Sequence, residues 1–284
     1  MSSPKVWLIT GTSSGLGRAV AEYVLSQGDI VVATARRPET LDALREQYPS
    51  KSQLLVLKLD VTNNEEILSV FEDIRKTYGR LDVLYNNAAY SLLGEVEATP
   101  LDVGQKLFAT NFWGAATVMR EAVRFFREVN KPGVGGRIIN ASSMSGIQGM
   151  PGIGYYGASK YALEGLCDSL ALELDPEWNI KITSVVLGEF RTKGVSNSVK
   201  LPAHPAYTKP NIGRNQVLKV FGKPDMPDGQ DPYKAAVQIY KLAYLARPPL
   251  RIPLGTGAVA FAKAKSAHFA EIVEKYGCWT DELD

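Results

Sequence analysis

The sequence predicts a single α/β domain over residues 1–284, built on a doubly wound parallel sheet flanked by helices. The chain has 284 residues, of which 45% are hydrophobic and 22% charged, and this suits one soluble domain with one large core. Short apolar runs alternate with longer amphipathic segments. Because the runs are almost continuously apolar, they are typical of strands that a parallel sheet buries on both faces.

The predicted elements follow one another regularly along the first two thirds of the chain. The buried strands are expected at 6–9, 30–35, 54–59, 81–85, 137–141 and 180–187, with a last strand at 250–254. The amphipathic segments long enough to be crossover helices lie at 16–27, 64–78, 101–129 and 156–174. Repeated strand–helix–strand units of this kind form a doubly wound sheet.

The regular pattern stops after Leu187. Residues 188–231 show no sustained period and carry prolines at 202, 205, 210, 224 and 227. Loops of that length usually cover a binding site or are disordered. We therefore interpret 188–231 as a substrate-loop region, followed by a helix at 232–245 and a C-terminal helical segment at about 256–277.

Charge and composition exclude several classes of partner. The chain has 32 Lys and Arg against 30 Asp and Glu, so no basic excess indicates nucleic acid or an anionic membrane. Two cysteines (Cys167, Cys278) and two histidines (His204, His268) predict neither a disulfide framework nor a metal site. The apolar run near the N-terminus is too short for a signal peptide or a membrane span. We expect a cytoplasmic protein that acts on small molecules.

A glycine-rich turn follows the first predicted strand, with the sequence TGTSSGLG at positions 10–17. Glycine permits the tight turn and lets backbone N–H groups and the start of the next helix approach a pyrophosphate. Such a turn alone could also be a plain connection, but its place between a strand and a helix favours a dinucleotide site of the Rossmann type. The candidate phosphate-binding residues are Gly11, Ser13, Ser14, Gly15, Leu16 and Gly17.

The end of the second predicted strand indicates which dinucleotide binds. NAD-binding folds place an acid there to bind the ribose 2′-hydroxyl, whereas this chain has Thr34-Ala35-Arg36-Arg37. Arginine matches a 2′-phosphate, to which it donates charge-assisted hydrogen bonds. The alternative is an ordinary solvated basic turn. We predict that Arg36 and Arg37 select NADP(H).

Tyr156 and Lys160 stand four positions apart at the start of a predicted helix, so they share one helical face. A tyrosine is a poor base at neutral pH unless a nearby cation stabilises its phenolate, and Lys160 could supply that cation. Ser143 lies at the end of a predicted strand, at the ligand-facing edge of the sheet, where its hydroxyl could hold a substrate oxygen. Tyrosine and lysine at this spacing are also common in cores and on surfaces, and Ser142 and Ser145 compete with Ser143.

Together these residues resemble the classical short-chain dehydrogenase/reductase family, over about residues 5–192. The loop at 10–17 is similar to its TGxxxGxG motif and Asn86-Asn87-Ala88-Ala89 to its NNAG motif, with Ala89 in place of glycine. The resemblance implies that Asp60 and Val61 contact the adenine and that Asn87, Ala88, Gly188 and Thr192 also bind cofactor. Leu187 replaces the proline of the family's PG motif, and Ser14 stands where some NADP-preferring members have a basic residue. Within the family the pattern looks most like 17β-hydroxysteroid and retinol dehydrogenase-like members.

The resemblance also implies a chemistry and an assembly. Tyr156 would be the general acid in carbonyl reduction and the general base in alcohol oxidation, while Ser143 fixes the substrate oxygen. Lys160 would hold the nicotinamide ribose and lower the pKa of Tyr156, and Asn111 would position a water for proton relay. No metal is required. The family's frequent dimers and tetramers lead us to expect a homodimer or homotetramer.

The substrate is expected to be a hydrophobic ketone or aldehyde, or the corresponding alcohol. The candidate pocket residues are mostly apolar or aromatic, although each could equally belong to the core: Tyr90, Gln148, Met150, Ile153 and Phe190. Two other functions remain open at this point. One is a non-catalytic NADP(H)-binding sensor or interaction protein on the same fold. The other is a dehydratase, epimerase or enoyl reductase, although enoyl reductases usually separate the tyrosine and lysine more widely.

Overall fold

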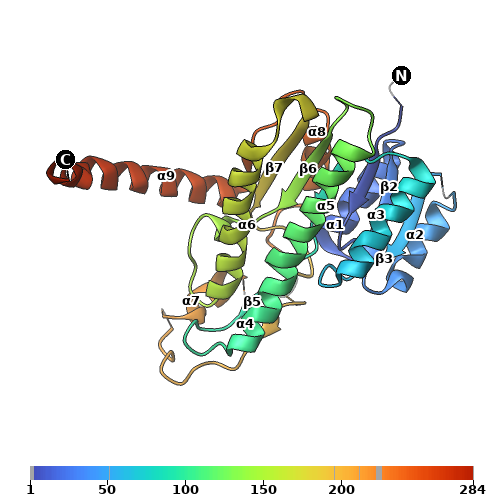
Figure 1. Ribbon diagram of the computed structural model, residues 1–284. Helices are drawn as coiled ribbons and strands as arrows, with labels where there is room; N and C mark the ends of the chain where they lie inside the picture. Colours follow the sequence, from blue (N-terminus) through green and yellow to red (C-terminus); the bar gives the residue numbers. More distant parts are fainter. Residues whose placement is uncertain (1–2, 51, 195, 211, 222–225, 284) are drawn as a thin grey trace.

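A seven-stranded parallel sheet forms the centre of the structure, with the strand order β3-β2-β1-β4-β6-β7-β9. The computed structural model describes residues 3–50, 52–194, 196–210, 212–221 and 226–283 (Figure 1). The strands of the sheet are β1 (Val6–Ile9), β2 (Ile30–Ala35), β3 (Leu54–Lys58), β4 (Val83–Asn86), β6 (Gly136–Ala141), β7 (Ile180–Leu187) and β9 (Arg251–Leu254). The doubly wound parallel sheet predicted from the apolar runs is thus confirmed.

The order of the strands fixes where a ligand can bind. The chain starts at β1 in the middle of the sheet, moves outward to β3, and then returns to the other side of β1 as β4. The connections after β1 and β4 therefore diverge, and in open α/β sheets the crevice at such a switch point is where ligands bind. Leu8 of β1 pairs with Val32 of β2 and with Leu84 of β4, so the register is continuous across this point.

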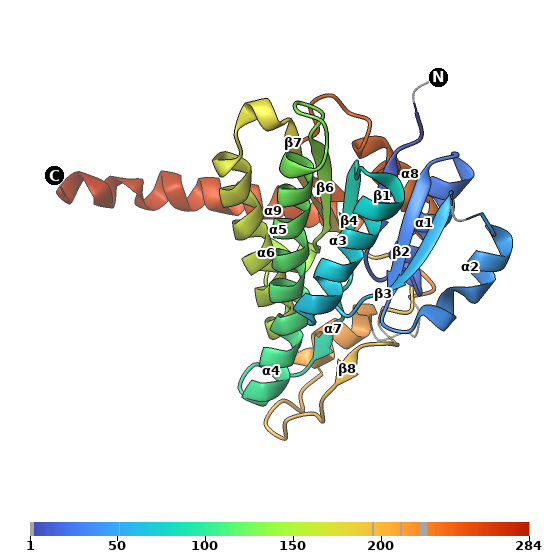
Figure 2. The same cartoon turned by 45° about the vertical axis from the view of Figure 1, so that its right-hand side comes forward.

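Helices cover both faces of the sheet (Figure 2). Helices α3, α5 and α6 pack on one face, and α1 and α8 pack on the other. The helices of the described residues are α1 (Gly15–Ser26), α2 (Asp42–Gln47), α3 (Asn64–Tyr78), α4 (Leu101–Phe108), α5 (Ala115–Glu128), α6 (Gly154–Glu173), α7 (Arg214–Phe221), α8 (Pro232–Leu242) and α9 (Thr256–Tyr276).

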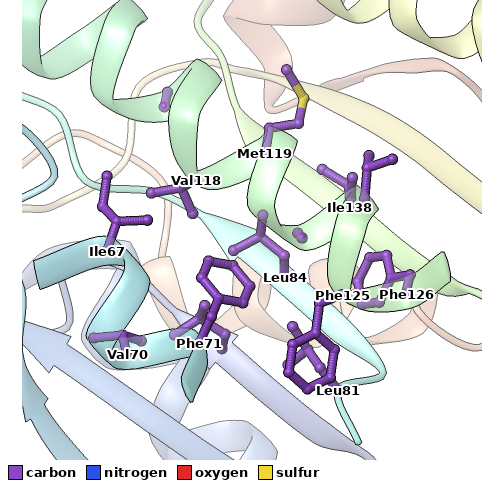
Figure 3. Close-up of a cluster of buried hydrophobic side chains, with 14 of the residues drawn as sticks. Ile67, Val70, Phe71, Leu81, Leu84, Val118, Met119, Phe125, Phe126 and Ile138 are labelled. Atoms are coloured by element: carbon purple, nitrogen blue, oxygen red, sulfur yellow. The ribbon is translucent and has the colours of Figure 1, made fainter. Parts of the chain in front are cut away.

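Apolar side chains of the helices and the sheet form the core on the face of α3 and α5. Figure 3 shows Phe71 of α3 and Met119 of α5 among the side chains that meet Leu84 of β4 and Ile138 of β6. All four residues are buried. On the opposite face Trp7 of β1 stacks on Tyr240 of α8, with ring centroids 5.7 Å apart. Burial on both faces explains why the strand sequences lack polar alternation.

The long helix predicted at 101–129 is divided in the structure. Helix α4 passes into a π-helical turn, Ala109–Gly114, before α5 begins. A Cβ atom on Gly114 would lie 2.7 Å from the carbonyl oxygen of Val61, so this glycine permits the close approach of the loop after β3. The apolar period continues through the turn, which is why the sequence alone did not reveal it.

The region predicted to be aperiodic, 188–231, contains two short elements. Strand β8 (Val199–Lys200) pairs with β5 (Leu92–Leu93), and α7 lies a little further along the chain. The pairing joins segments about a hundred residues apart, and each strand has only two residues, so no local period marked it. Positions 195, 211 and 222–225 of this region lie outside the described residues. Predicted boundaries elsewhere differ by a few residues at the ends of β3, β4, α6 and α8.

Candidate active site

The loops that follow the carboxyl ends of five strands surround a cleft of about 910 Å³. The expected cofactor residues that line it come from the loops after β1, β2, β3, β4 and β7 and from helix α6: Gly11, Ser13, Ser14, Gly15, Leu16, Arg36, Arg37, Asp60, Val61, Asn87, Ala88, Tyr156, Lys160 and Thr192. The volume lies in the range of cofactor and ligand sites. The structure thus brings together, in one cleft, residues that span most of the sequence.

The glycine-rich turn is held against the end of β4. The Thr10 hydroxyl accepts hydrogen bonds from the backbone N–H groups of Asn87 and Ala88, at 2.8 and 2.9 Å. The Asn87 amide in turn donates to the carbonyl oxygens of Thr10 and Gly11. A Cβ atom on Gly17 would lie 2.4 Å from the Gly11 oxygen and 2.5 Å from Asn87 Nδ2. Gly17, which does not itself border the cleft, is therefore required for this close packing.

Helix α1 begins at the cleft with its first N–H groups free of a side-chain cap. Its N-cap residue is Ser14, whose side chain makes no capping hydrogen bond. The first four N–H groups of a helix have no partner within the helix, and the helix dipole favours an anion at this end. The start of α1 therefore fits a pyrophosphate group, as the glycine-rich turn predicted.

The basic residues lie at the other end of the cleft. Arg36 and Arg37 are exposed and directly follow β2, as expected for contacts to a 2′-phosphate. Burial raises the pKa of the Tyr90 hydroxyl, and the charges of Arg36 and Lys106 oppose this rise. Lys106 of α4 also lines the cleft, although the sequence analysis did not single it out. Its pairing with Asp102 four residues earlier, at 2.9 Å, has the pattern of an ordinary surface ion pair.

Tyr156, Lys160 and Ser143 meet near the end of β6. The Ser143 side chain acts on the Tyr156 hydroxyl and lowers its pKa. Lys160 Nζ donates to the carbonyl oxygen of Ala141 at 2.7 Å and lies 5.9 Å from the centroid of the Tyr156 ring. The first turns of α6 therefore place phenol and ammonium on one face, toward the end of the strand that carries the serine.

The geometry also distinguishes the three neighbouring serines. The Ser143 hydroxyl accepts a hydrogen bond from the backbone N–H of Ser145 at 3.1 Å, besides its contact with Tyr156. The Ser145 hydroxyl points elsewhere and lies 3.4 Å from the sulfur of Met150. The Ser142 hydroxyl is buried without a hydrogen-bond partner, although Ser142 borders the cleft. Of the three serines, only Ser143 acts on the pKa of Tyr156.

Burial acts on both titratable groups of this cluster. It raises the pKa of Tyr156, and the hydrogen bond with Ser143 lowers it in part. Burial lowers the pKa of Lys160 to about 8, and the nearby carboxylate of Glu164 opposes that fall. Glu164 is itself buried and accepts hydrogen bonds from Ser184 Oγ and Arg251 Nε. The Glu164 carboxylate therefore favours the charged form of Lys160.

Asn111 lies in the π-helical turn, and its amide is bound within the protein. Its Nδ2 donates to the Tyr90 carbonyl at 2.8 Å, and its Oδ1 accepts from the Tyr90 N–H at 3.0 Å. Its Nδ2 also lies 3.2 Å from the Ser159 hydroxyl on α6. The side chain thus joins the loop after β4 to α6, while its neighbours Ala109 and Thr110 border the cleft. Its role in a water relay rests on the resemblance alone.

The candidate substrate residues do not all border the cleft. Tyr90 lines the cleft, whereas Gln148, Met150, Ile153 and Phe190 are not among the residues that border it. Met150 packs against a small apolar cluster that includes Val186 and Ala258, and Phe190 is buried with its backbone bridged to Gln230. Gly188, predicted to lie beside the cofactor, is not among the residues that border the cleft, and its N–H donates to the carbonyl of Leu254 at 2.9 Å. The alternative interpretation as core residues fits Met150 and Phe190.

Two further features of the described residues bear on function. No group of histidine, cysteine, aspartate and glutamate side chains there is arranged to bind a metal ion. No helix in the same part of the chain combines the length and the apolar character needed to cross a bilayer.

The chain is similar in sequence and structure to known proteins. Residues 5–201 match the family described as short chain dehydrogenase. The chain is 35% identical to a 3-ketodihydrosphingosine reductase of Bacteroides thetaiotaomicron over 268 residues, which are 93% of each chain. The crystal structure of a short-chain dehydrogenase from Streptomyces avermitilis superposes with a TM-score of 0.87 at 35% identity. That alignment covers 99% of this chain and 100% of the other, so it extends over α9.

A third relative was solved with a bound dinucleotide. The structure of ElxO with NADP superposes with a TM-score of 0.70 at 26% identity, covering 90% of this chain and 99% of that one. None of these three proteins is named as a steroid or retinol dehydrogenase. The nearer likeness to such members therefore stays a prediction.

Proposed function

The chain belongs to the short-chain dehydrogenase/reductase family, and on that premise we propose that it is an NADP(H)-dependent oxidoreductase that interconverts a carbonyl group and an alcohol. The observation that carries the proposal is the cluster at the end of β6. There the Ser143 side chain lowers the pKa of the Tyr156 hydroxyl, and the buried Lys160 ammonium lies one helical turn away, over the Tyr156 ring. Tyr156 and Lys160 both line a cleft whose other end carries Arg36 and Arg37.

The residues of the cleft fit a dinucleotide phosphate. The uncapped start of α1 would bind the pyrophosphate. Because Gly17 has no side chain, the glycine-rich turn can pack closely against the first turn of this helix. Arg36 and Arg37 would bind the 2′-phosphate, with Asp60 and Val61 at the adenine and Asn87, Ala88 and Thr192 along the cleft. Such charge-assisted contacts favour NADP(H) over NAD(H). The ElxO structure, which holds NADP, supports this choice of cofactor.

When bound, the nicotinamide supplies or accepts the hydride. The protein's own residues handle the proton and the orientation of the substrate. In reduction, Tyr156 donates its proton to the carbonyl oxygen, while the Ser143 hydroxyl binds that oxygen and holds it in place. In oxidation the phenolate takes the proton of the alcohol. The Lys160 ammonium stabilises the phenolate electrostatically, because in a buried site charges interact more strongly than in water.

A hydrophobic ketone, aldehyde or alcohol suits the rest of the cleft. Tyr90, Leu187 and Val199 border it and offer apolar surface. The relative from Bacteroides thetaiotaomicron is named as a reductase of a keto compound, 3-ketodihydrosphingosine, which supports a carbonyl substrate. We also propose that the protein acts in the cytoplasm, which agrees with its near-neutral net charge. We expect it to be a homo-oligomer, because members of the family frequently form dimers and tetramers.

The test is an assay of purified protein with NADPH against a panel of apolar ketones and aldehydes. We expect NADPH to be consumed, which is measured as a loss of absorbance of the reduced nicotinamide, and the alcohol that corresponds to each carbonyl substrate to be formed. Binding of NADPH without turnover of any member of the panel would favour a sensor or interaction protein. Product analysis separates carbonyl reduction from dehydration, epimerisation or enoyl reduction.

A further inference from the structure

Helix α9 extends away from the rest of the molecule (Figures 1 and 2). Its first turns are anchored where Ala258 and Phe261 pack against Met144 and Val186. Beyond this anchor its side chains are exposed, and Ala258 is the only buried residue of the helix. In globular proteins most of the stability of a helix comes from packing of one face, which α9 lacks over most of its length.

The exposed part of α9 carries a stripe of large apolar side chains. Phe269, Ile272, Val273 and Tyr276 follow the spacing that places residues on one helical face. Phe269 is 63% exposed and Val273 is 56% exposed, and Trp279, just beyond the helix, is 69% exposed. Val259 extends the stripe toward the anchor, while the long side chain of Lys265 within it can carry its ammonium to the edge.

The opposite side of α9 argues against a membrane as the missing partner. It carries three alanines (Ala260, Ala264 and Ala267) among charged side chains. The charged residues of the helix are mixed in sign, with Lys263, Lys265 and Lys275 against Glu271 and Glu274. Helices that lie on membranes have a strongly charged polar face rich in Lys and Arg. The polar side of α9, with both signs of charge, lacks that excess of positive charge, so an apolar protein surface fits the stripe better than an anionic membrane does.

We propose that the stripe is an interface between two copies of this chain, in which the α9 helices pack against each other about a two-fold axis. A two-fold interface uses the same patch on both subunits, so a single apolar stripe is sufficient. From typical side-chain areas, the stripe exposes roughly 600 Å² on each copy. Two copies would bury roughly 1,200 Å², which reaches the lower end of the range for stable interfaces.

The test measures the mass of the full-length protein in solution by sedimentation equilibrium or light scattering. The wild type should have the mass of two chains, or of four if a second interface also forms. The double variant Phe269→Glu with Val273→Glu should have half the wild-type mass at the same concentration, because each copy would bring two carboxylates into the interface. The matched control, Ala264→Glu with Ala267→Glu, adds the same charge to the other side of α9 and should keep the wild-type mass.

Several outcomes would overturn the proposal. A monomeric wild type would do so, and so would a stripe variant whose mass equals that of the wild type. A wild type that is monomeric in buffer but sediments with phosphatidylcholine–phosphatidylserine vesicles would assign the stripe to a membrane instead. Far-UV circular dichroism shows whether each variant is folded. Because the measurement is a mass, its result does not depend on the proposed enzymatic activity.

Discussion

Lys160 Nζ lies 5.9 Å from the centroid of the Tyr156 ring, and the same Nζ donates a hydrogen bond of 2.7 Å to the carbonyl of Ala141. The ammonium is therefore held between the end of β6 and the phenol rather than free to turn toward solvent. Ser143, in the turn just after β6, and Tyr156 and Lys160, on α6, thus place the three groups expected to act in proton transfer on adjoining parts of the chain. Four predictions follow from this cluster and from the basic end of the cleft.

The first prediction concerns the proton of Tyr156. Tyr156→Phe should lower kcat by about a hundredfold to ten-thousandfold, the usual contribution of a positioned general acid or base. The affinity for NADPH should change little, because the residues that would bind the pyrophosphate and the 2′-phosphate are untouched. Steady-state kinetics and a fluorescence titration with NADPH measure the two quantities. A near-normal kcat of Tyr156→Phe would show that Tyr156 is not the general acid or base.

The second prediction separates two roles of Lys160. Lys160→Ala should lower kcat and also raise the KM for NADPH, because one ammonium is expected to serve both the phenol and the nicotinamide ribose. The control is Lys76→Ala, which removes an exposed ammonium on α3 and should leave both constants unchanged. If Lys160→Ala lowers kcat but leaves the KM for NADPH unchanged, the prediction that Lys160 binds the nicotinamide ribose is wrong.

The third prediction is a pH dependence of carbonyl reduction. Reduction needs a protonated Tyr156 and a charged Lys160. Burial raises the pKa of Tyr156 and lowers that of Lys160 to about 8, so Lys160 loses its proton first as the pH rises. The kcat/KM for reduction should therefore fall as the pH rises through about 8.

A variant at Glu164 tests the origin of that fall. The Glu164 carboxylate raises the pKa of Lys160, so Glu164→Gln should move the fall in kcat/KM to lower pH. The exposed change Glu72→Gln on α3 serves as the control and should not move it. An identical pH profile in Glu164→Gln and wild type would show that another group titrates.

The fourth prediction concerns the choice of cofactor. A charge-assisted contact from Arg36 to the 2′-phosphate is worth about 1.5–3 kcal/mol. At about 1.4 kcal/mol per factor of ten, this corresponds to a preference for NADPH over NADH of about ten- to a hundredfold in kcat/KM. The preference should shrink at high salt, because Arg36 is exposed.

The double variant Ala35→Asp with Arg36→Gln should reverse this preference. The new carboxylate would repel a phosphate and accept a hydrogen bond from a free 2′-hydroxyl. Kinetics with both cofactors at two salt concentrations provide the measurement. Equal use of NADH and NADPH by the wild type would contradict the interpretation of Arg36.

Local patterns in the sequence were sufficient for the sheet, the glycine-rich turn and the shared face of Tyr156 and Lys160. Apolar runs mark buried strands whatever their neighbours are, and residues four apart on a helix face the same way in any fold. The loop at 10–17 was recognisable for the same reason, since its backbone needs glycine at positions where a side chain would clash. These features depend on residues close together in the chain.

Contacts between distant segments were decided only by the tertiary structure. The contact of Ser143 with Tyr156, the binding of Asn111 to the loop at Tyr90 and the place of Lys106 in the cleft each join parts of the chain that no local period relates. The same is true of Met150 and Phe190, whose apolar side chains suit a core as well as a pocket, so that only the packing around them distinguishes the two. The apolar stripe of α9 is visible in the sequence, but its exposure follows from where the last strand, β9, directs the helix.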